Sequence, residues 1–306
     1  MRAIQVLLRS SIDYAGLFPP AGLDMRASVD NYAGYRTGAS SWALGRFVLP
    51  VERMAQFEES SRKHLPTQPG MSPWQLTVLL GRDLDSDLSS IAEFNRRHAL
   101  PREGSAVIDS VEVKTSSIAA TEDTMHRIPD HLQAYIEIPI DRDPGALLDA
   151  IARAGRRAKV RTGGVTGEAF PRPPDLIRFM AACIRTQVAF KATAGLHHSL
   201  RAEYRLTYEP DSPRGMMFGF LNLFLAAAFL RAGMEEQRAQ QVLEEGSVDA
   251  LRVDEDAIHW GGLHLGLQDL HRARQETIIS FGSCSFTEPL DELQTLHLLD
   301  SRVPQA

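Results

Sequence analysis

Hydrophobic residues along this chain fall into two alternating patterns. Short runs that are apolar or rich in β-branched residues occur at 44–49, 75–80, 106–114, 134–140, 158–162, 188–194, 257–260 and 277–281. Longer stretches with apolar residues at helical spacing lie at 51–64, 84–98, 146–156, 174–184, 215–231, 267–275 and 290–298. Runs of the first kind are typical of strands, and those of the second kind are typical of amphipathic helices.

Strands that alternate with helices predict a parallel sheet built from right-handed crossovers. Eight such alternations in a chain of 306 residues match the size and rhythm of a (β/α)8 barrel of the TIM type. We expect a single domain over residues 1–306, with the barrel at 44–300 and an amino-terminal extension at 1–43. An open doubly wound sheet is the alternative, but no Gly-x-Gly-x-x-Gly follows the first expected strand.

Four successive expected strands carry ionisable residues on one face and apolar residues on the other. The ionisable residues are Glu112 and Lys114, then Glu137, then Lys159 and Arg161, and finally Lys191, which shares its face with Thr193. Both faces of a parallel strand are normally apolar, and unpaired buried charges are costly, so this pattern indicates a site inside the barrel. An antiparallel sheet with one wet face, or an internal layer of salt bridges without chemistry, would give the same alternation.

The charges on this face favour a small anionic metabolite as the ligand. Two glutamates stand against four basic residues, which leaves two positive charges in excess. We expect Lys159, Arg161 and Lys114 to contact a carboxylate or a phosphate ester.

Lys191 is the expected catalytic residue. Burial and the nearby basic residues would lower its pKa, and a neutral amine can attack a carbonyl or act as a base. Glu137 or His197 would then move protons. A lysine that only binds an anion is the alternative.

The segment from Phe190 to Gly195 (Phe-Lys-Ala-Thr-Ala-Gly) resembles the sixth-strand segment of class I aldolases of the deoxyribose-phosphate aldolase type. That resemblance implies a Schiff-base lysine at Lys191. It also implies phosphate binding by Gly261, Gly262 and Ser283, which stand where that family's last two loops hold a phosphate. The family's second lysine, on its seventh strand, has no counterpart in this strand count, because Ile258 stands at about that position.

Other residues expected at the barrel mouth follow the strands directly. Gly163 and Gly164 end one strand and form a substrate-binding loop or a plain turn, and His197 and His198 follow another. Together with Glu112, Glu137, His259 and His264, these histidines could instead hold a divalent metal. The leading hypothesis needs no cofactor and no metal.

Three further segments leave alternatives open. Residues 13–20 plug the barrel, contribute Asp13 and Tyr14 to the site, or pack on a partner subunit. The loop at 200–215, with Arg201, Arg205 and Arg214, is either a lid over an anion or a solvated connection. Cys284 is expected to be an inert thiol.

Charge and composition exclude several classes of partner. A net charge of −6 without a basic cluster argues against nucleic acid. Two cysteines and no recognisable export signal predict a protein of the reducing cytoplasm. Residues 216–230 are too short to span a bilayer, so they predict a buried helix or a homo-oligomer contact.

Three functions are therefore in competition. The first is an aldolase-like lyase or isomerase acting on a small anionic carbonyl compound. The second is a metal-dependent hydrolase or isomerase that uses the Glu and His ligands. The third is a barrel without catalysis that binds a ligand or dimerises.

Overall fold

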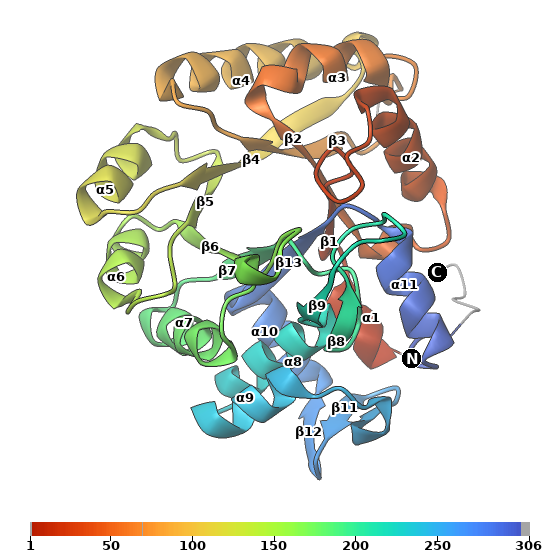
Figure 1. The fold of residues 1–306 in the computed structure, drawn as a ribbon. Coiled ribbons are helices and arrows are strands. Elements are labelled where there is room, and N and C mark those ends of the chain that lie inside the picture. Colours follow the sequence, from red (N-terminus) through yellow and green to blue (C-terminus); the bar gives the residue numbers. More distant parts are fainter. Residues whose placement is uncertain (1, 69, 301–306) are drawn as a thin grey trace.

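The computed structural model describes residues 2–68 and 70–300. Its centre is a closed barrel of parallel strands in the order β1-β13-β7-β6-β5-β4-β3-β2 (Figure 1). The barrel strands are β1 (Ile12–Tyr14), β2 (Leu44–Pro50), β3 (Trp74–Leu79), β4 (Ala106–Lys114), β5 (Gln133–Glu137), β6 (Arg157–Arg161), β7 (Phe190–Thr193) and β13 (Ile278–Ser283). The predicted (β/α)8 barrel is confirmed, and the antiparallel alternative is wrong.

Helices lie between successive strands and surround the barrel. They are α1 (Arg2–Leu8), α2 (Met25–Thr37), α3 (Met54–Ser61), α4 (Leu84–His98), α5 (Ile118–Arg127), α6 (Gly145–Arg153), α7 (Pro173–Thr186), α8 (Phe220–Arg231), α9 (Glu236–Glu244), α10 (Leu267–Glu276) and α11 (Thr287–Thr295). Several begin at a side-chain cap, because Asp24, Asp83 and Ser117 each accept a hydrogen bond from a backbone N–H of the first turn.

The first strand of the barrel lies inside the segment expected to be an extension. β1 pairs with β13 on one side and with β2 on the other, so residues 12–14 close the barrel. This changes the strand count by one: β6 with Lys159 is the sixth strand, and β7 with Lys191 is the seventh.

The prediction of a barrel strand at 257–260 is wrong. These residues form β11 (Ala257–Trp260), which pairs with β10 (Leu251–Val253) and β12 (Leu263–Gly266) in a separate antiparallel sheet. Gly261 and Gly262, both with positive φ, make the two-residue turn between β11 and β12, which matches the type of hairpin that favours glycine. A second hairpin, β8 (Ala202–Arg205) and β9 (Arg214–Met217), follows β7.

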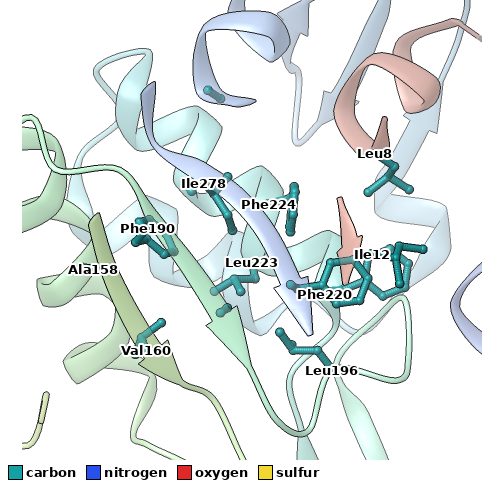
Figure 2. Close-up of a cluster of buried hydrophobic side chains, with 14 of the residues drawn as sticks. Leu8, Ile12, Ala158, Val160, Phe190, Leu196, Phe220, Leu223, Phe224 and Ile278 are labelled. Atoms are coloured by element: carbon teal, nitrogen blue, oxygen red, sulfur yellow. The ribbon is translucent and has the colours of Figure 1, made fainter. Parts of the chain in front are cut away.

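The apolar core lies between the outer face of the barrel and the helices. Ala158, Val160 and Phe190 point away from the barrel axis toward this layer, and Phe220 of α8 stacks on Phe281 of β13 at 4.9 Å between ring centroids (Figure 2). Alternate residues of the same strands therefore face the barrel interior.

Helix α8 is covered by the chain itself. Every residue from Phe220 to Leu230 is buried, and α7, α9 and α10 pack around the helix. The expected helix at 215–231 begins later because Arg214–Met217 is strand β9. The expectation of a dimer contact through residues 216–230 is thus wrong for the helical part, because neighbouring helices of the same chain already cover it. Within residues 2–68 and 70–300, no helix has both the length and the apolar character that a membrane crossing requires.

Candidate active site

A cavity of about 240 Å³ opens at the carboxyl ends of the barrel strands. Its walls come from six barrel strands and the segment after β1, and include Ala15, Phe18, Pro19, Pro20, Val48, Leu79, Glu112, Lys159, Arg161, Gly164, Lys191, Thr193, His197, Gly282 and Cys284. This end of a barrel is where such enzymes carry out their chemistry.

The charged floor of the cavity is a chain of ion pairs across five strands. Lys191 Nζ lies 2.6 Å from Asp13 Oδ2 and 2.6 Å from Glu112 Oε1. Lys159 Nζ lies 2.5 Å from Glu112 Oε2 and 2.9 Å from Glu137 Oε2. Glu112 thus bridges the two lysines. All of these side chains are at most 11% exposed, so solvent screens them little.

Asp13 is held in place by further hydrogen bonds. Its Oδ2 accepts from Ser280 Oγ at 2.8 Å, and its Oδ1 accepts from the Arg46 backbone N–H at 2.9 Å. Of the expectations for residues 13–20, the structure brings Asp13 to the charged layer, while Ala15, Phe18 and the two prolines line the cavity. Tyr14, in contrast, points into an aromatic cluster with Tyr32 and Phe47.

The expectation of a lowered pKa at Lys191 is wrong. Burial by itself lowers the pKa of this lysine, but the carboxylates of Asp13 and Glu112 raise it, and the net shift is upward. The ammonium also lies 5.2 Å from the centre of the Tyr135 ring. Lys191 is therefore a cation enclosed by two carboxylates and an aromatic face.

Glu112 shows the opposite shift. Burial raises its pKa, but Lys159 and Lys191 outweigh burial and lower the pKa to about 2. This carboxylate stays ionised while both lysines are charged.

The predicted excess of positive charge is wrong for the buried layer. Lys114 is 78% exposed and lies 3.9 Å from Glu137, and Arg161 is exposed at the cavity edge. Asp13 joins the layer, so three carboxylates face two ammonium groups there. The expected layer of internal salt bridges is therefore present, and it borders a cavity.

The two cations of the cavity floor are lysines, although lysine is rare in this chain and arginine is common. Of its 33 lysine and arginine residues, only four are lysines, namely Lys63, Lys114, Lys159 and Lys191. Arginine suits buried ion pairs better, because its planar group pairs with two carboxylate oxygens and never loses its charge. Both cations of the cavity floor are nevertheless lysines, whose amines can become neutral.

Not all predicted binding residues reach this cavity. Gly164, Thr193 and His197 do, but Gly163 packs against Phe170, and Ser283 is buried without lining the cavity. Gly261 and Gly262 lie in the hairpin of the separate sheet, so a phosphate loop there is wrong.

The paired histidines point in different directions. His198 Nδ1 lies 3.2 Å from Glu292 Oε1, and its ring stacks on Tyr204. His197 borders the cavity, with its Nδ1 3.6 Å from Cys284 Sγ. Burial, with a smaller effect from His198, lowers the pKa of His197 to about 4, so its ring is neutral at pH 7.

The residues proposed as alternative metal ligands are dispersed. His259 and His264 belong to β11 and β12, and a lysine lies between Glu112 and Glu137. Among the described residues, no three His, Cys, Asp or Glu side chains are grouped as a metal site.

Three residues that contact the charged layer or the cavity wall were not predicted, although a signal existed for two of them. Ser280 alternates with Phe281, and Tyr135 shares a strand face with Glu137, so alternation alone points both inward. Tyr208 lies 3.6 Å from Cys284 Sγ through its hydroxyl, which no local pattern indicates.

In comparisons with known proteins, no family model, no curated protein and no solved structure matches the chain. Any functional inference therefore depends on the geometry. That geometry combines two amines, three carboxylates and a neutral imidazole around one cavity, which suits proton transfer and attack on a carbonyl group.

Proposed function

We propose that this protein is an enzyme that forms an imine with a small carbonyl compound, as a lyase or isomerase of the aldolase kind. The observation that carries the proposal is the pair of buried lysines on the sixth and seventh strands, bridged by Glu112 beneath the cavity. Buried ion pairs seldom stabilise a fold more than apolar packing would, so a catalytic role explains them better than stability does.

The revised strand count changes how the resemblance to deoxyribose-phosphate aldolases applies, because the segment 190–195 begins at the seventh strand position and not the sixth. In that family the Schiff-base lysine is on the sixth strand and a second lysine is on the seventh. Here Lys159 and Lys191 occupy those two strands. We therefore assign the nucleophile to Lys159 and not to Lys191.

The surroundings of the two lysines support this division. Lys191 is 1% exposed and enclosed by Asp13, Glu112 and the Tyr135 ring, so it remains an ammonium that stabilises negative charge on the substrate oxygen. Lys159 also contacts Glu137, which lies at the outer side of the network beside Lys114. Glu137 accepts the proton that Lys159 must lose before it attacks the carbonyl carbon.

The remaining steps use the groups around the cavity. The carbinolamine loses its oxygen as water and becomes an iminium ion, which draws electrons from the bond between the α carbon and the hydroxyl-bearing β carbon. His197, neutral at pH 7, accepts the hydroxyl proton as that bond breaks and an aldehyde leaves. Protonation of the enamine and hydrolysis of the imine then regenerate Lys159.

Both cysteines are free and buried, which supports the expected cytoplasmic location.

Reductive trapping tests the proposal. Purified protein is incubated with small aldehydes, ketones and keto acids in the presence of cyanoborohydride, and the modified lysine is found by peptide mass spectrometry. We expect an adduct on Lys159 that Lys159→Met abolishes and that Lys63→Met, a change at an exposed lysine, retains. An adduct on Lys191 instead would overturn the assignment of the nucleophile. Labelling confined to Lys63, Lys114 and the amino terminus would overturn imine chemistry altogether.

A further inference from the structure

A second cavity of about 240 Å³ lies beside the first. Pro20 and His197 belong to the walls of both, so the two chambers are neighbours that share a partition. The β8–β9 hairpin forms much of the second wall, which includes Tyr204, Arg205, Leu206, Thr207, Tyr208, Arg214 and Met217. We call this cavity the hairpin chamber.

Two arginines of the hairpin chamber are directly opposite each other. Arg205 of β8 and Arg214 of β9 are cross-strand partners in the register of the hairpin. Like charges in such positions repel and destabilise the strand pair. Glu203 compensates Arg214, with Oε2 3.5 Å from Arg214 Nε, whereas Arg205 has no ion pair among the described residues. Arg205 is thus a cation of the chamber without an ion pair, whereas Glu288 of α11, the carboxylate in the chamber wall, accepts a hydrogen bond from the Tyr208 hydroxyl.

The hairpin is anchored well enough to hold these arginines in position. The Tyr204 ring stacks on His198 with 3.4 Å between ring centroids, and Leu206 and Met217 are buried beneath the strands. At the tip of the hairpin, the Tyr208 hydroxyl donates a hydrogen bond to Glu288 Oε2 at 2.8 Å. The same hydroxyl lies beside Cys284, which lines the first cavity. These contacts connect the hairpin with the wall of the candidate active site.

We propose that the hairpin chamber binds the anionic end of the substrate, a phosphate ester or a carboxylate, while the carbonyl carbon of the same molecule reaches Lys159. This inference rests on the proposed function and narrows its substrate class to short carbonyl compounds with a charged terminus. An anion between Arg205 and Arg214 relieves their repulsion and accepts charge-assisted hydrogen bonds from both guanidinium groups. Because the site is open to solvent, its affinity falls as ionic strength rises.

The first experiment compares trapping of a charged and a neutral aldehyde. Glyceraldehyde 3-phosphate should half-saturate reductive trapping at a concentration about tenfold below that of glyceraldehyde, as expected for charge-assisted contacts at a partly exposed site. The double variant Arg205→Gln/Arg214→Gln should bring the ratio to about one while glyceraldehyde is trapped as before, which also shows that the variant is folded. Arg96→Gln, a change at an exposed arginine of α4, should leave the ratio unchanged. Equal half-saturation by both aldehydes in the unmodified protein would overturn the inference.

The second experiment separates this inference from the proposed function. Glycerol 3-phosphate and glycerate lack a reactive carbonyl, so calorimetric titration with them measures anion binding without imine formation. Binding that is lost in Arg205→Gln/Arg214→Gln supports the anion site even if no aldehyde is trapped. The ligand that binds more tightly shows whether the site prefers a phosphate ester or a carboxylate. Absence of binding by both compounds would overturn the site even if imine chemistry is established.

Discussion

The ionised state of Glu112 makes a quantitative prediction for stability. Burial alone would raise the pKa of this carboxyl, but Lys159 and Lys191 lower it from 4.5 to about 2. The folded protein therefore holds Glu112 ionised at pH values where the unfolded chain would protonate it. The resulting stabilisation is complete above pH 4.5 and is lost as the pH falls toward 2. A shift of this size corresponds to about 3 kcal/mol in total, and to about 2 kcal/mol between pH 5 and pH 3.

The assay is urea unfolding of the unmodified protein and of Glu112→Gln at several pH values between 5 and 3. The variant lacks this titration, so the difference in unfolding free energy between the two proteins should shrink by about 2 kcal/mol across the range. Glu93→Gln removes a carboxylate beside Arg96 on the surface of α4, where solvent screens the pair, and should change the slope much less. A difference that stays constant or grows as the pH falls would refute the idea that the two lysines keep Glu112 ionised.

Two further predictions concern the walls of the cavity. The His197 imidazole, whose pKa burial and His198 lower to about 4, should remain neutral at pH 6 in an NMR titration; protonation near pH 6.5 would contradict its burial. A Cβ added at Gly163 would lie 2.4 Å from the Phe170 ring, whereas one at Gly167 would meet nothing within 4 Å. Gly163→Ala should therefore lower the unfolding free energy by about 1–3 kcal/mol, and Gly167→Ala should not; equal urea midpoints for the two variants would count against this packing.

The fold class was predictable because most strands carry a strong local signal. Strand β1 was missed for the opposite reason: it has three residues, and the polar Asp13 interrupts its apolar character. The run at 257–260 took its place in the count, although Gly261-Gly262 between two apolar runs is itself a hairpin signal. One short strand thus shifted the strands from β2 to β7 by one position, while β13 remained the eighth.

The same omission explains the errors at the site. Alternation correctly identified four inward side chains, since Glu112, Glu137, Lys159 and Lys191 all meet. It also placed Lys114 and Arg161 on the inward face, where both are exposed at the ends of their strands. The direction of the pKa shift at Lys191, however, depends on Asp13, which is 178 residues away in the chain. No local pattern gives the distance between such residues. Other basic residues lower the pKa of a neighbouring lysine, whereas carboxylates raise it.

A second charged pair in the same barrel shows what a structural ion pair looks like in this chain, and it differs from the pairs made by the two buried lysines. Arg46 of β2 and Asp109 of β4 form two hydrogen bonds, of 2.7 and 2.8 Å, across β3. This pair lines neither of the two cavities described above, and its planar geometry satisfies both partners, as expected of a structural contact. The cavity floor uses lysines instead, which bond to carboxylates less completely but can release a proton. Since one chain uses both solutions in one barrel, the contrast favours chemistry at Lys159 and Lys191 over a purely structural salt bridge.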